Sequence, residues 1–225
     1  MHPPNHLFSI YHTLLSHYGP QGWWPLYNNK TGKIEYHPGD YSFPKNEQQS
    51  FEISVGAILT QNTSWTNVEK ALHSLHHAHA LAPEKILSLS QQKLALLIHS
   101  SGYHNQKAKK LKAFARFIQS GTPVTRNNLL HIWGIGPETA DSILLYAHHE
   151  PFFVVDAYTT RIFTRYGFPS QSYHDIQQFV MHNLPKKHEI YNELHALLVQ
   201  LGKQMCKPKP LCEQCPLQHT CAQQI

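Results

Sequence analysis

The stretch 131-HIWGIGPETADSILLYAHHEPFFVVDAYTTRIF-163 joins two helical patterns through a Gly-Ile-Gly turn and then places a lone aspartate after two valines. Gly134 and Gly136 carry no Cβ atom, so the backbone of the turn can approach a neighbour closely. Pro137 suits the first turn of the second helix, whose first N–H groups lack partners within the helix. These N–H donors, together with the helix dipole, can bind a phosphate-sized anion. The turn by itself still favours a plain helical hairpin without a ligand.

Outward from this stretch, apolar residues recur at helical spacing almost throughout, which predicts an all-α fold. Residues 22–46 are rich in Pro, Gly, Asn and Tyr and are expected to form a loop. Phe152–Val155 is the one segment that fits a short strand. Helices are expected over residues 6–17, 48–59, 65–76, 83–87, 91–99, 105–118, 127–133, 137–148, 157–166, 174–183 and 189–202.

The composition is that of a globular protein, with 41% apolar and 15% charged residues. No run approaches the ~18 uninterrupted apolar residues of a membrane span, so we expect no membrane partner. The formal charge of +5 suggests a polyanionic partner. The N-terminal segment MHPPNHLFSIYHTLL has neither the basic start nor the cleavage site of a secretory signal. We therefore expect a cytoplasmic protein, associated with the nucleoid in a cell without organelles.

All four cysteines lie near the C-terminus in the pattern C-x5-C-x2-C-x5-C, which suggests one metal centre rather than disulfides. Structural zinc sites often use two C-x2-C pairs, and only one such pair is present here. The symmetric flanking gaps suit a cubane iron–sulfur cluster better, with zinc and disulfides as the alternatives. The candidate ligands are Cys206, Cys212, Cys215 and Cys221.

Asp156 by itself is best interpreted as the N-cap of the helix that follows it. Taken together, however, the hairpin, the aspartate and the cysteines resemble the helix–hairpin–helix DNA glycosylase superfamily, in the branch that includes endonuclease III. The resemblance extends from about Phe51 to Cys221. The matching segments are LTQNTSW (59–65), GYHNQKAKKLK (102–112), GIGPETADSIL (134–144), VVDAYTTRIF (154–163) and the four cysteines.

This resemblance implies base excision repair of double-stranded DNA that contains a damaged base, with the protein acting as a monomer. Asp156 would face a base flipped out of the duplex and stabilise positive charge on the sugar as the glycosidic bond breaks. The cysteines would hold a 4Fe–4S cluster, mainly structural, although the first gap is one residue shorter than in endonuclease III. The DNA-binding residues would be Gln61, Asn62, Lys107, Gly134, Ile135 and Gly136.

Two further positions bear on the kind of glycosylase. Family members that also cut the strand use a lysine eighteen residues before the aspartate, and Glu138 stands there in this chain. A carboxylate cannot form a Schiff base, so a monofunctional glycosylase is expected. The segment GPQGWWP resembles 3-methyladenine glycosylases, and Trp23, Trp24 and Pro25 would form a base pocket that stacks on a cationic alkylated purine. Both tryptophans could instead simply pack a long loop.

Three alternatives stay open at this point. One is a bifunctional glycosylase and AP lyase for oxidised pyrimidines, which Glu138 disfavours. An adenine-mismatch glycosylase would carry a further C-terminal domain, which we do not expect because the sequence stops at Ile225. The third alternative is a DNA-damage-binding protein without catalysis.

By the same resemblance, residues 48–149 would form a central helical lobe, and residues 1–47 plus 150–225 a second lobe carrying the iron–sulfur loop 206–221.

Overall fold

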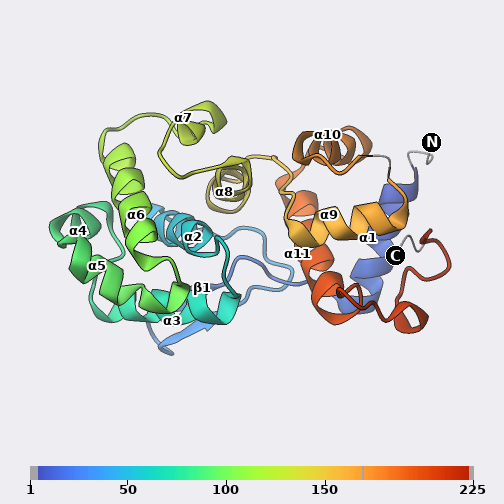
Figure 1. Ribbon diagram of the computed structural model, residues 1–225, viewed down its shortest axis with the longest axis horizontal. Coiled ribbons are helices and arrows are strands. Elements are labelled where there is room, and N and C mark those ends of the chain that lie inside the picture. Colours follow the sequence, from blue (N-terminus) through green and yellow to red (C-terminus); the bar gives the residue numbers. More distant parts are fainter. Residues whose placement is uncertain (1–4, 169, 223–225) are drawn as a thin grey trace. The chain divides into compact units, whose positions relative to one another are not determined.

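The computed structural model describes residues 5–168 and 170–222, which are predominantly helical, as expected (Figure 1). Within these residues, the helices are α1 (Asn5–Tyr18), α2 (Glu47–Leu59), α3 (Trp65–His77), α4 (Pro83–Ser88), α5 (Gln91–Leu97), α6 (His104–Gln119), α7 (Arg126–Leu130), α8 (Pro137–Ser142), α9 (Ala157–Tyr166), α10 (Tyr173–Asn183) and α11 (His188–Gln204). None of these helices is both long and apolar enough to cross a membrane.

Two expectations about strands were wrong. The segment 22–46 contains an antiparallel hairpin, in which β1 (Leu26–Asn28) pairs with β2 (Lys33–Glu35). Residues 151–156, by contrast, form no strand. Three apolar residues of this segment are buried as irregular backbone, so their apolar character reflects burial rather than pairing.

The described residues form two compact units. The hairpin unit consists of residues 24–35 and 42–149, and the aspartate unit consists of residues 5–23, 36–41 and 150–222 without 169. This division differs from the expected lobes at residues 24–35 and 42–47, which belong with the hairpin unit. The β-hairpin explains part of the difference, because β1 packs against α2.

Helix α2 is the centre of the hairpin unit, and all its residues from Phe51 to Leu59 are buried. The buried Glu52 carboxylate accepts the backbone N–H of Tyr27 at 2.8 Å and lies 3.0 Å from Nε2 of His76. These partners offset the cost of burying a carboxylate. Gly56 brings the Trp24 indole against the helix, since a Cβ at this position would lie 3.0 Å from the ring.

The aspartate unit is built on the packing of α9 against α11, with α1 also against α11. A Cβ at Gly202 would lie 2.4 Å from the ring of Tyr158, so the glycine permits close contact between α9 and α11. On α11, the buried Glu193 carboxylate accepts the N–H of Gln21 at 2.8 Å and the hydroxyl of Tyr41 at 2.7 Å. Burial raises the pKa of Glu193, and the two hydrogen bonds oppose that rise.

Candidate functional site

The Gly-Ile-Gly turn lies between α7 and α8 in the hairpin unit. Gly134 has a φ of +84°, in the region that favours glycine, whereas Gly136 is extended and is the N-cap of α8. Ile135 is buried and both glycines are exposed, so the turn is anchored by its apolar residue and presents its backbone outward. No side chain caps the start of α8.

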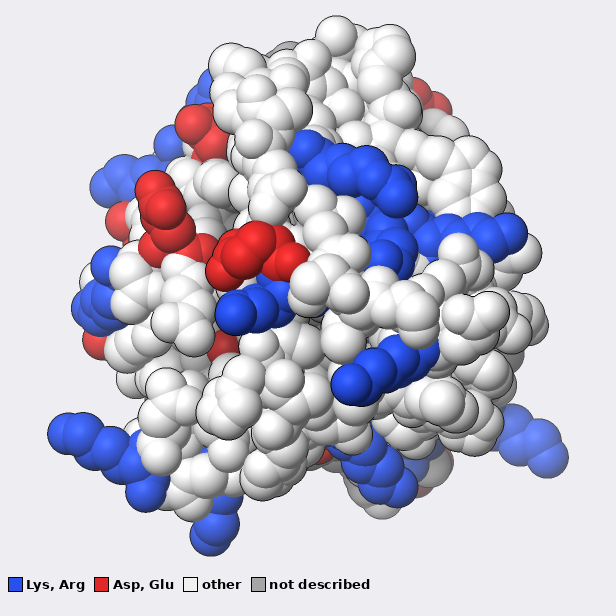
Figure 2. Space-filling model, turned by 90° about the vertical axis from the view of Figure 1, so that its left-hand side faces the viewer, with Lys and Arg blue, Asp and Glu red and all other residues white. Residues whose placement is uncertain are grey.

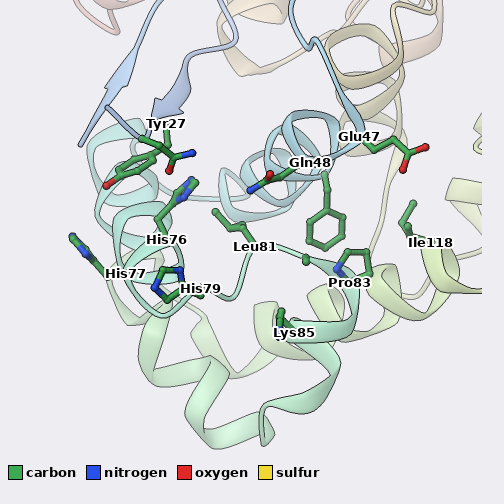
Figure 3. A pocket seen from close by; sticks show the side chains of 13 residues that line it. Tyr27, Glu47, Gln48, His76, His77, His79, Leu81, Pro83, Lys85 and Ile118 are labelled. Carbon is green, nitrogen blue, oxygen red and sulfur yellow. The ribbon is translucent and has the colours of Figure 1, made fainter. Parts of the chain in front are cut away.

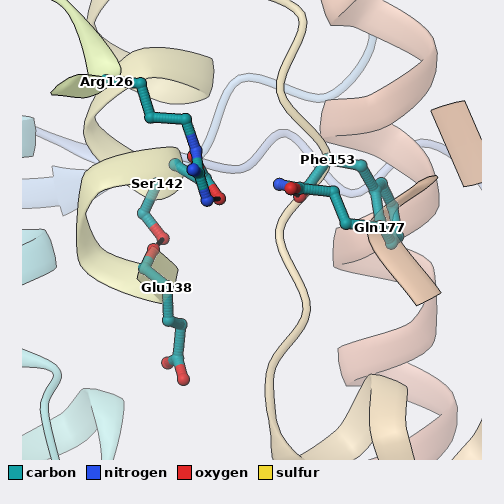
Figure 4. A network of polar contacts seen from close by, with 6 residues as sticks. Arg126, Glu138, Ser142, Phe153 and Gln177 are labelled. Atoms are coloured by element: carbon teal, nitrogen blue, oxygen red, sulfur yellow. Dashed lines mark hydrogen bonds and ion pairs between the residues drawn. The ribbon is translucent and has the colours of Figure 1, made fainter. Parts of the chain in front are cut away.

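An ion pair joins the two helices of this motif. Arg126 at the start of α7 donates Nε to Oδ1 of Asp141 at 2.7 Å and Nη2 to Oδ2 at 3.0 Å (Figure 4). Asp141 is fully buried on α8. Bidentate pairing of this kind fixes orientation as well as distance, so it holds α7 and α8 in one arrangement.

Gln61 contacts this turn through its side-chain amide. Its Nε2 donates to Oγ1 of Thr139 at 2.8 Å and to the carbonyl of Gly134 at 3.2 Å. Nζ of Lys110 donates to Oε1 of the same glutamine, and the stem of Lys110 lies over Gly134. The structure therefore brings Gln61 and the hairpin together, with Lys110 as a third member. Asn62 is exposed beside them with a φ of +53°.

The prediction that Lys107 binds DNA is wrong for this structure. Its side chain is only 2% exposed, and its ammonium donates to the carbonyls of Leu59 at 2.9 Å and Ser101 at 2.6 Å. Burial, with a smaller contribution from Lys110, lowers its pKa to about 8. A signal was present in the sequence, because Lys107 shares a helix face with the apolar Leu111 and Phe114.

The remaining cations of α6 have different environments. Nζ of Lys112 donates to the carbonyls of Leu87 and Leu89 at the end of α4, so it joins two helices. Lys109 and Arg116 are exposed. Figure 2 looks onto the side of the hairpin unit that carries α4 and α5, where blue Lys and Arg side chains gather above and to the right of the centre and red acidic ones lie to the left. Exposed cations of this kind are available to phosphates.

Of the expected base-pocket residues, Trp24 and Pro25 are buried in the hairpin unit. The Trp24 ring lies 5.5 Å from the ring of Trp65, edge to face, and 5.3 Å from the ring of Tyr146. Trp24 is only 7% exposed, so its ring is enclosed by protein, as the packing interpretation expects. Trp23 belongs to the aspartate unit, where it is half-buried with its ring 5.9 Å from that of Tyr36.

Asp156 is the N-cap of α9, and its Oδ1 accepts the N–H of Thr159 at 2.7 Å. Its other oxygen, Oδ2, lies 3.7 Å from Nε2 of His195 on α11. The buried segment before the aspartate is held by Gln177 of α10, whose amide donates to the carbonyl of Phe153 at 2.7 Å (Figure 4). The carboxylate is therefore supported on both sides within the aspartate unit.

The four cysteines follow α11 and include the short 3-10 turn Cys212–Gln214. None of the four is in a disulfide. All four line one cavity, together with Arg165, Met205, Pro210, Leu211 and Gln218. Burial raises the pKa of Cys215, a hydrogen bond with the backbone of Leu217 partly opposes that rise, and the charges of the other three cysteines add to it. No three His, Cys, Asp or Glu side chains in residues 5–168 and 170–222 form a ligand group for a single metal ion.

Two arginines of α9 connect this cysteine loop to the helix that Asp156 caps. Arg161 donates Nε to the carbonyl of Cys206 at 2.8 Å, and Nη1 of Arg165 lies 3.5 Å from Sγ of the same cysteine. Sγ of Cys221 lies 3.5 Å from the carbonyl of Arg165. Four thiols around one cavity, with a guanidinium beside one of them, fit the ligand set of an iron–sulfur cluster.

A cavity of about 610 Å³ in the hairpin unit is lined by three histidines, His76, His77 and His79, with Tyr27 on one side and Lys85 on another (Figure 3). None of the predicted site residues lines it. Its size would admit a nucleobase, but no residue that the family resemblance assigns to base binding contributes to its lining.

Sequence reasoning did not single out His195 or the specific role of Lys110. His195 lies outside the matching segments, and Lys110 is one of four lysines within the segment 102–112, so each is recognised only through its neighbour, Asp156 in one case and Gln61 in the other. Two strongly exposed aromatic residues of the hairpin unit were also missed. Tyr103 precedes α6 and is 71% exposed, and Trp133 precedes the glycine turn and is 56% exposed. The available signal was an aromatic residue next to a glycine of a matching segment, Gly102 for Tyr103 and Gly134 for Trp133.

Comparison with known proteins agrees with this geometry. Residues 55–186 match the family described as HhH-GPD superfamily base excision DNA repair protein. The "Putative DNA repair glycosylase" of Methanocaldococcus jannaschii is 41% identical, over 96% of this chain and 95% of its own length. Endonuclease III of Thermotoga maritima is 27% identical, over 80% of this chain and 86% of its own length.

The fold also matches solved structures, among them the following two. A non-covalent endonuclease III–DNA complex covers 99% of this chain, and this chain covers 97% of it, with a TM-score of 0.79 at 20% identity. The H. pylori 3-methyladenine DNA glycosylase bound to 1,N6-ethenoadenine covers 88% of this chain, with 97% of its own length matched, a TM-score of 0.69 and 26% identity. The fold is thus endonuclease III-like, and the chain belongs to the HhH-GPD superfamily of base excision repair DNA glycosylases.

Proposed function

We propose that this protein is a monofunctional DNA glycosylase that removes alkylated purines, such as 3-methyladenine, by hydrolysing the N-glycosidic bond of a flipped nucleotide. The observation that carries the monofunctional assignment is Glu138, a carboxylate where strand-cutting members of the family have their lysine. Lys107 does not replace that amine, because it is buried and bonded to two carbonyls. Attack on the sugar therefore falls to water.

In this proposal each unit has its own task. The hairpin unit would bind the duplex backbone through the exposed glycine turn and the exposed cations of α6, with Gln61 and Asn62 meeting the bases. In the aspartate unit, the ionised carboxylate of Asp156 would stabilise the oxocarbenium character of the sugar and orient the attacking water. Its attachment to Thr159 at 2.7 Å keeps one oxygen in place during this step.

The substrate class rests on two observations. The H. pylori enzyme named above, at 26% identity, is a 3-methyladenine DNA glycosylase with 1,N6-ethenoadenine bound. In this chain, Trp23 is half-buried rather than enclosed, so it is the tryptophan that we assign to stacking on a flipped base. Purines alkylated at N3 or N7 carry positive charge and are attracted to an aromatic face.

We also propose that the four cysteines hold a 4Fe–4S cluster. The common cavity and the reach of Arg165 to Cys206 support this assignment. When bound, the cluster would supply a rigid cross-link for the C-terminal loop rather than a chemical step. Through Arg161 and Arg165 the loop would then brace α9, whose N-terminus carries Asp156.

The test uses purified protein and two duplexes, one with 3-methyladenine and one with thymine glycol. Each product is divided, and one half is treated with hot alkali, which breaks the strand at abasic sites. We expect enzyme-dependent, alkali-dependent breaks only in the methylated duplex, after subtraction of an enzyme-free control. Breaks without alkali at thymine glycol would instead identify a bifunctional enzyme for oxidised pyrimidines.

The matched control is Asp156→Asn. Asparagine is as good an N-cap as aspartate, so α9 should stay capped while the catalytic charge is lost. We expect the rate of base release to fall by at least about 100-fold, a typical contribution of a positioned carboxylate. If the variant still binds damaged duplex but releases the base this slowly, catalysis by Asp156 is supported. If it releases the base at the wild-type rate, the assignment is contradicted. Damage binding without base release by the wild type would indicate the non-catalytic alternative.

A further inference from the structure

The histidine beside Asp156 has no role in the function proposed so far. His195 projects from α11 with its Nε2 atom 3.7 Å from Oδ2 of Asp156. The side chains are 9% and 16% exposed, so both are largely shielded from solvent. Because Thr159 already binds Oδ1, the two carboxylate oxygens face different partners.

The surroundings of His195 hold its ring in place. His195 lies two helical turns before Gly202, so both residues are on the face of α11 that packs against α9. The close contact of Gly202 with Tyr158 fixes how near the two helices can come. The ring of Phe153 lies edge to face with the imidazole, 6.4 Å between centroids. The imidazole therefore lies next to Asp156 on a closely packed face of α11.

The charge state follows from this burial. Desolvation lowers the pKa of His195, and the negative charge of Asp156 only partly opposes it. A neutral imidazole has one N–H donor and one acceptor nitrogen. With the donor at Nε2, the ring offers its proton to Oδ2 and leaves the carboxylate charge intact.

We propose that His195 is the positioning residue of Asp156: its Nε2–H donates to Oδ2 while the Thr159 N–H holds Oδ1, which keeps the carboxylate ionised and in one orientation. The inference rests on the proposed catalytic role of Asp156. A separation of 3.7 Å is longer than a hydrogen bond, and catalytic hydrogen bonds are often long before substrate binds. Substrate binding then shortens this contact.

The experiment compares His195→Gln, His195→Asn and His195→Leu in the full chain. The amide nitrogen of glutamine reaches about as far as Nε2, and that of asparagine about as far as Nδ1. Single-turnover base release and duplex affinity are measured separately, on whichever duplex the wild type cleaves. We expect His195→Leu and His195→Asn to be slowed by about 100-fold, as for a misplaced catalytic group, with duplex affinity unchanged. Glutamine should restore most of the rate.

His182→Gln is the control for changing a histidine in this unit, because His182 is exposed on α10 and bonds only within its helix. Wild-type rates in His195→Leu overturn the inference, as does equal slowing of all three folded His195 variants, which would indicate packing alone. Should the leucine variant not fold, the glutamine–asparagine difference decides. A wild type that releases no base overturns the proposed function and this inference together, whereas an active wild type with unaffected variants overturns the inference alone.

Discussion

Replacing Gly134 by alanine should weaken the hairpin for two separable reasons. First, the φ of +84° is unfavourable for any residue with a Cβ, at about 1–2 kcal/mol. Second, the new Cβ would lie 2.6 Å from Cε, 2.7 Å from Cγ and 2.9 Å from Cδ of Lys110. Most of the lysine stem must therefore move away, and Nζ must leave Oε1 of Gln61.

The loss of that hydrogen bond costs about 0.5–1.5 kcal/mol. The total destabilisation by Gly134→Ala is then about 1.5–3.5 kcal/mol, the sum of the backbone and hydrogen-bond contributions. Lys110→Ala should remove the second contribution in advance. In that background Gly134→Ala should cost only the backbone contribution, about 1–2 kcal/mol.

The assay is equilibrium unfolding in denaturant of the wild type, the two single variants and the double variant, treated as a double-mutant cycle. Gly136→Ala is the matched control, because its backbone is extended and an added Cβ meets nothing within 4 Å. Gly136→Ala should lower the free energy of unfolding by less than about 1 kcal/mol, because alanine is a weaker N-cap than glycine. This loss should be the same with Lys110 and with Ala at position 110. An equal cost of Gly134→Ala in both backgrounds would refute the contact between Lys110 and Gly134.

Lys107→Met should destabilise the protein by about 1–3 kcal/mol, because the carbonyls of Leu59 and Ser101 lose their donor. Lys107→Met should leave the salt dependence of duplex binding unchanged. Lys109→Met, at an exposed position, should reduce the slope of log K against log salt concentration by about one if Lys109 meets a phosphate. A reduced slope for Lys107→Met would show that Lys107 reaches DNA. Protein purified without oxygen should contain iron and sulfide in equal amounts, and Cys215→Ser should lose part of both and lower the melting temperature; one zinc per chain would refute the cluster. The pKa of His195 is lowered in the native protein by burial, even beside Asp156. As the pH drops below about 6.5, the unfolded histidine therefore binds a proton more readily than the native one, and the free energy of unfolding should fall. His195→Gln removes this contribution, so the free energy of unfolding should change less between pH 7.5 and 5.5 in the variant than in the wild type. The same change in both proteins would contradict the lowered pKa of His195.

Much of the helical structure follows from local signals in the sequence. The helix after Asp156 was expected over residues 157–166 and has those bounds, with the aspartate as its cap. Capping, glycine turns and the spacing of apolar residues act over a few residues, so they are legible without knowledge of the fold. The family resemblance is likewise carried by short segments, and it brought the hairpin, Asp156 and the cysteines into one hypothesis.

Tertiary packing decided what several of those side chains do. Lys107 and Lys110 are three residues apart on α6, yet one is buried against backbone carbonyls and the other lies over Gly134. Adjacent Trp23 and Trp24 belong to different units. His195 meets Asp156 only because α9 and α11 pack together. Burial and pairing depend on residues that are distant in the chain, so residue type and local spacing could place these side chains on helices but could not assign their partners.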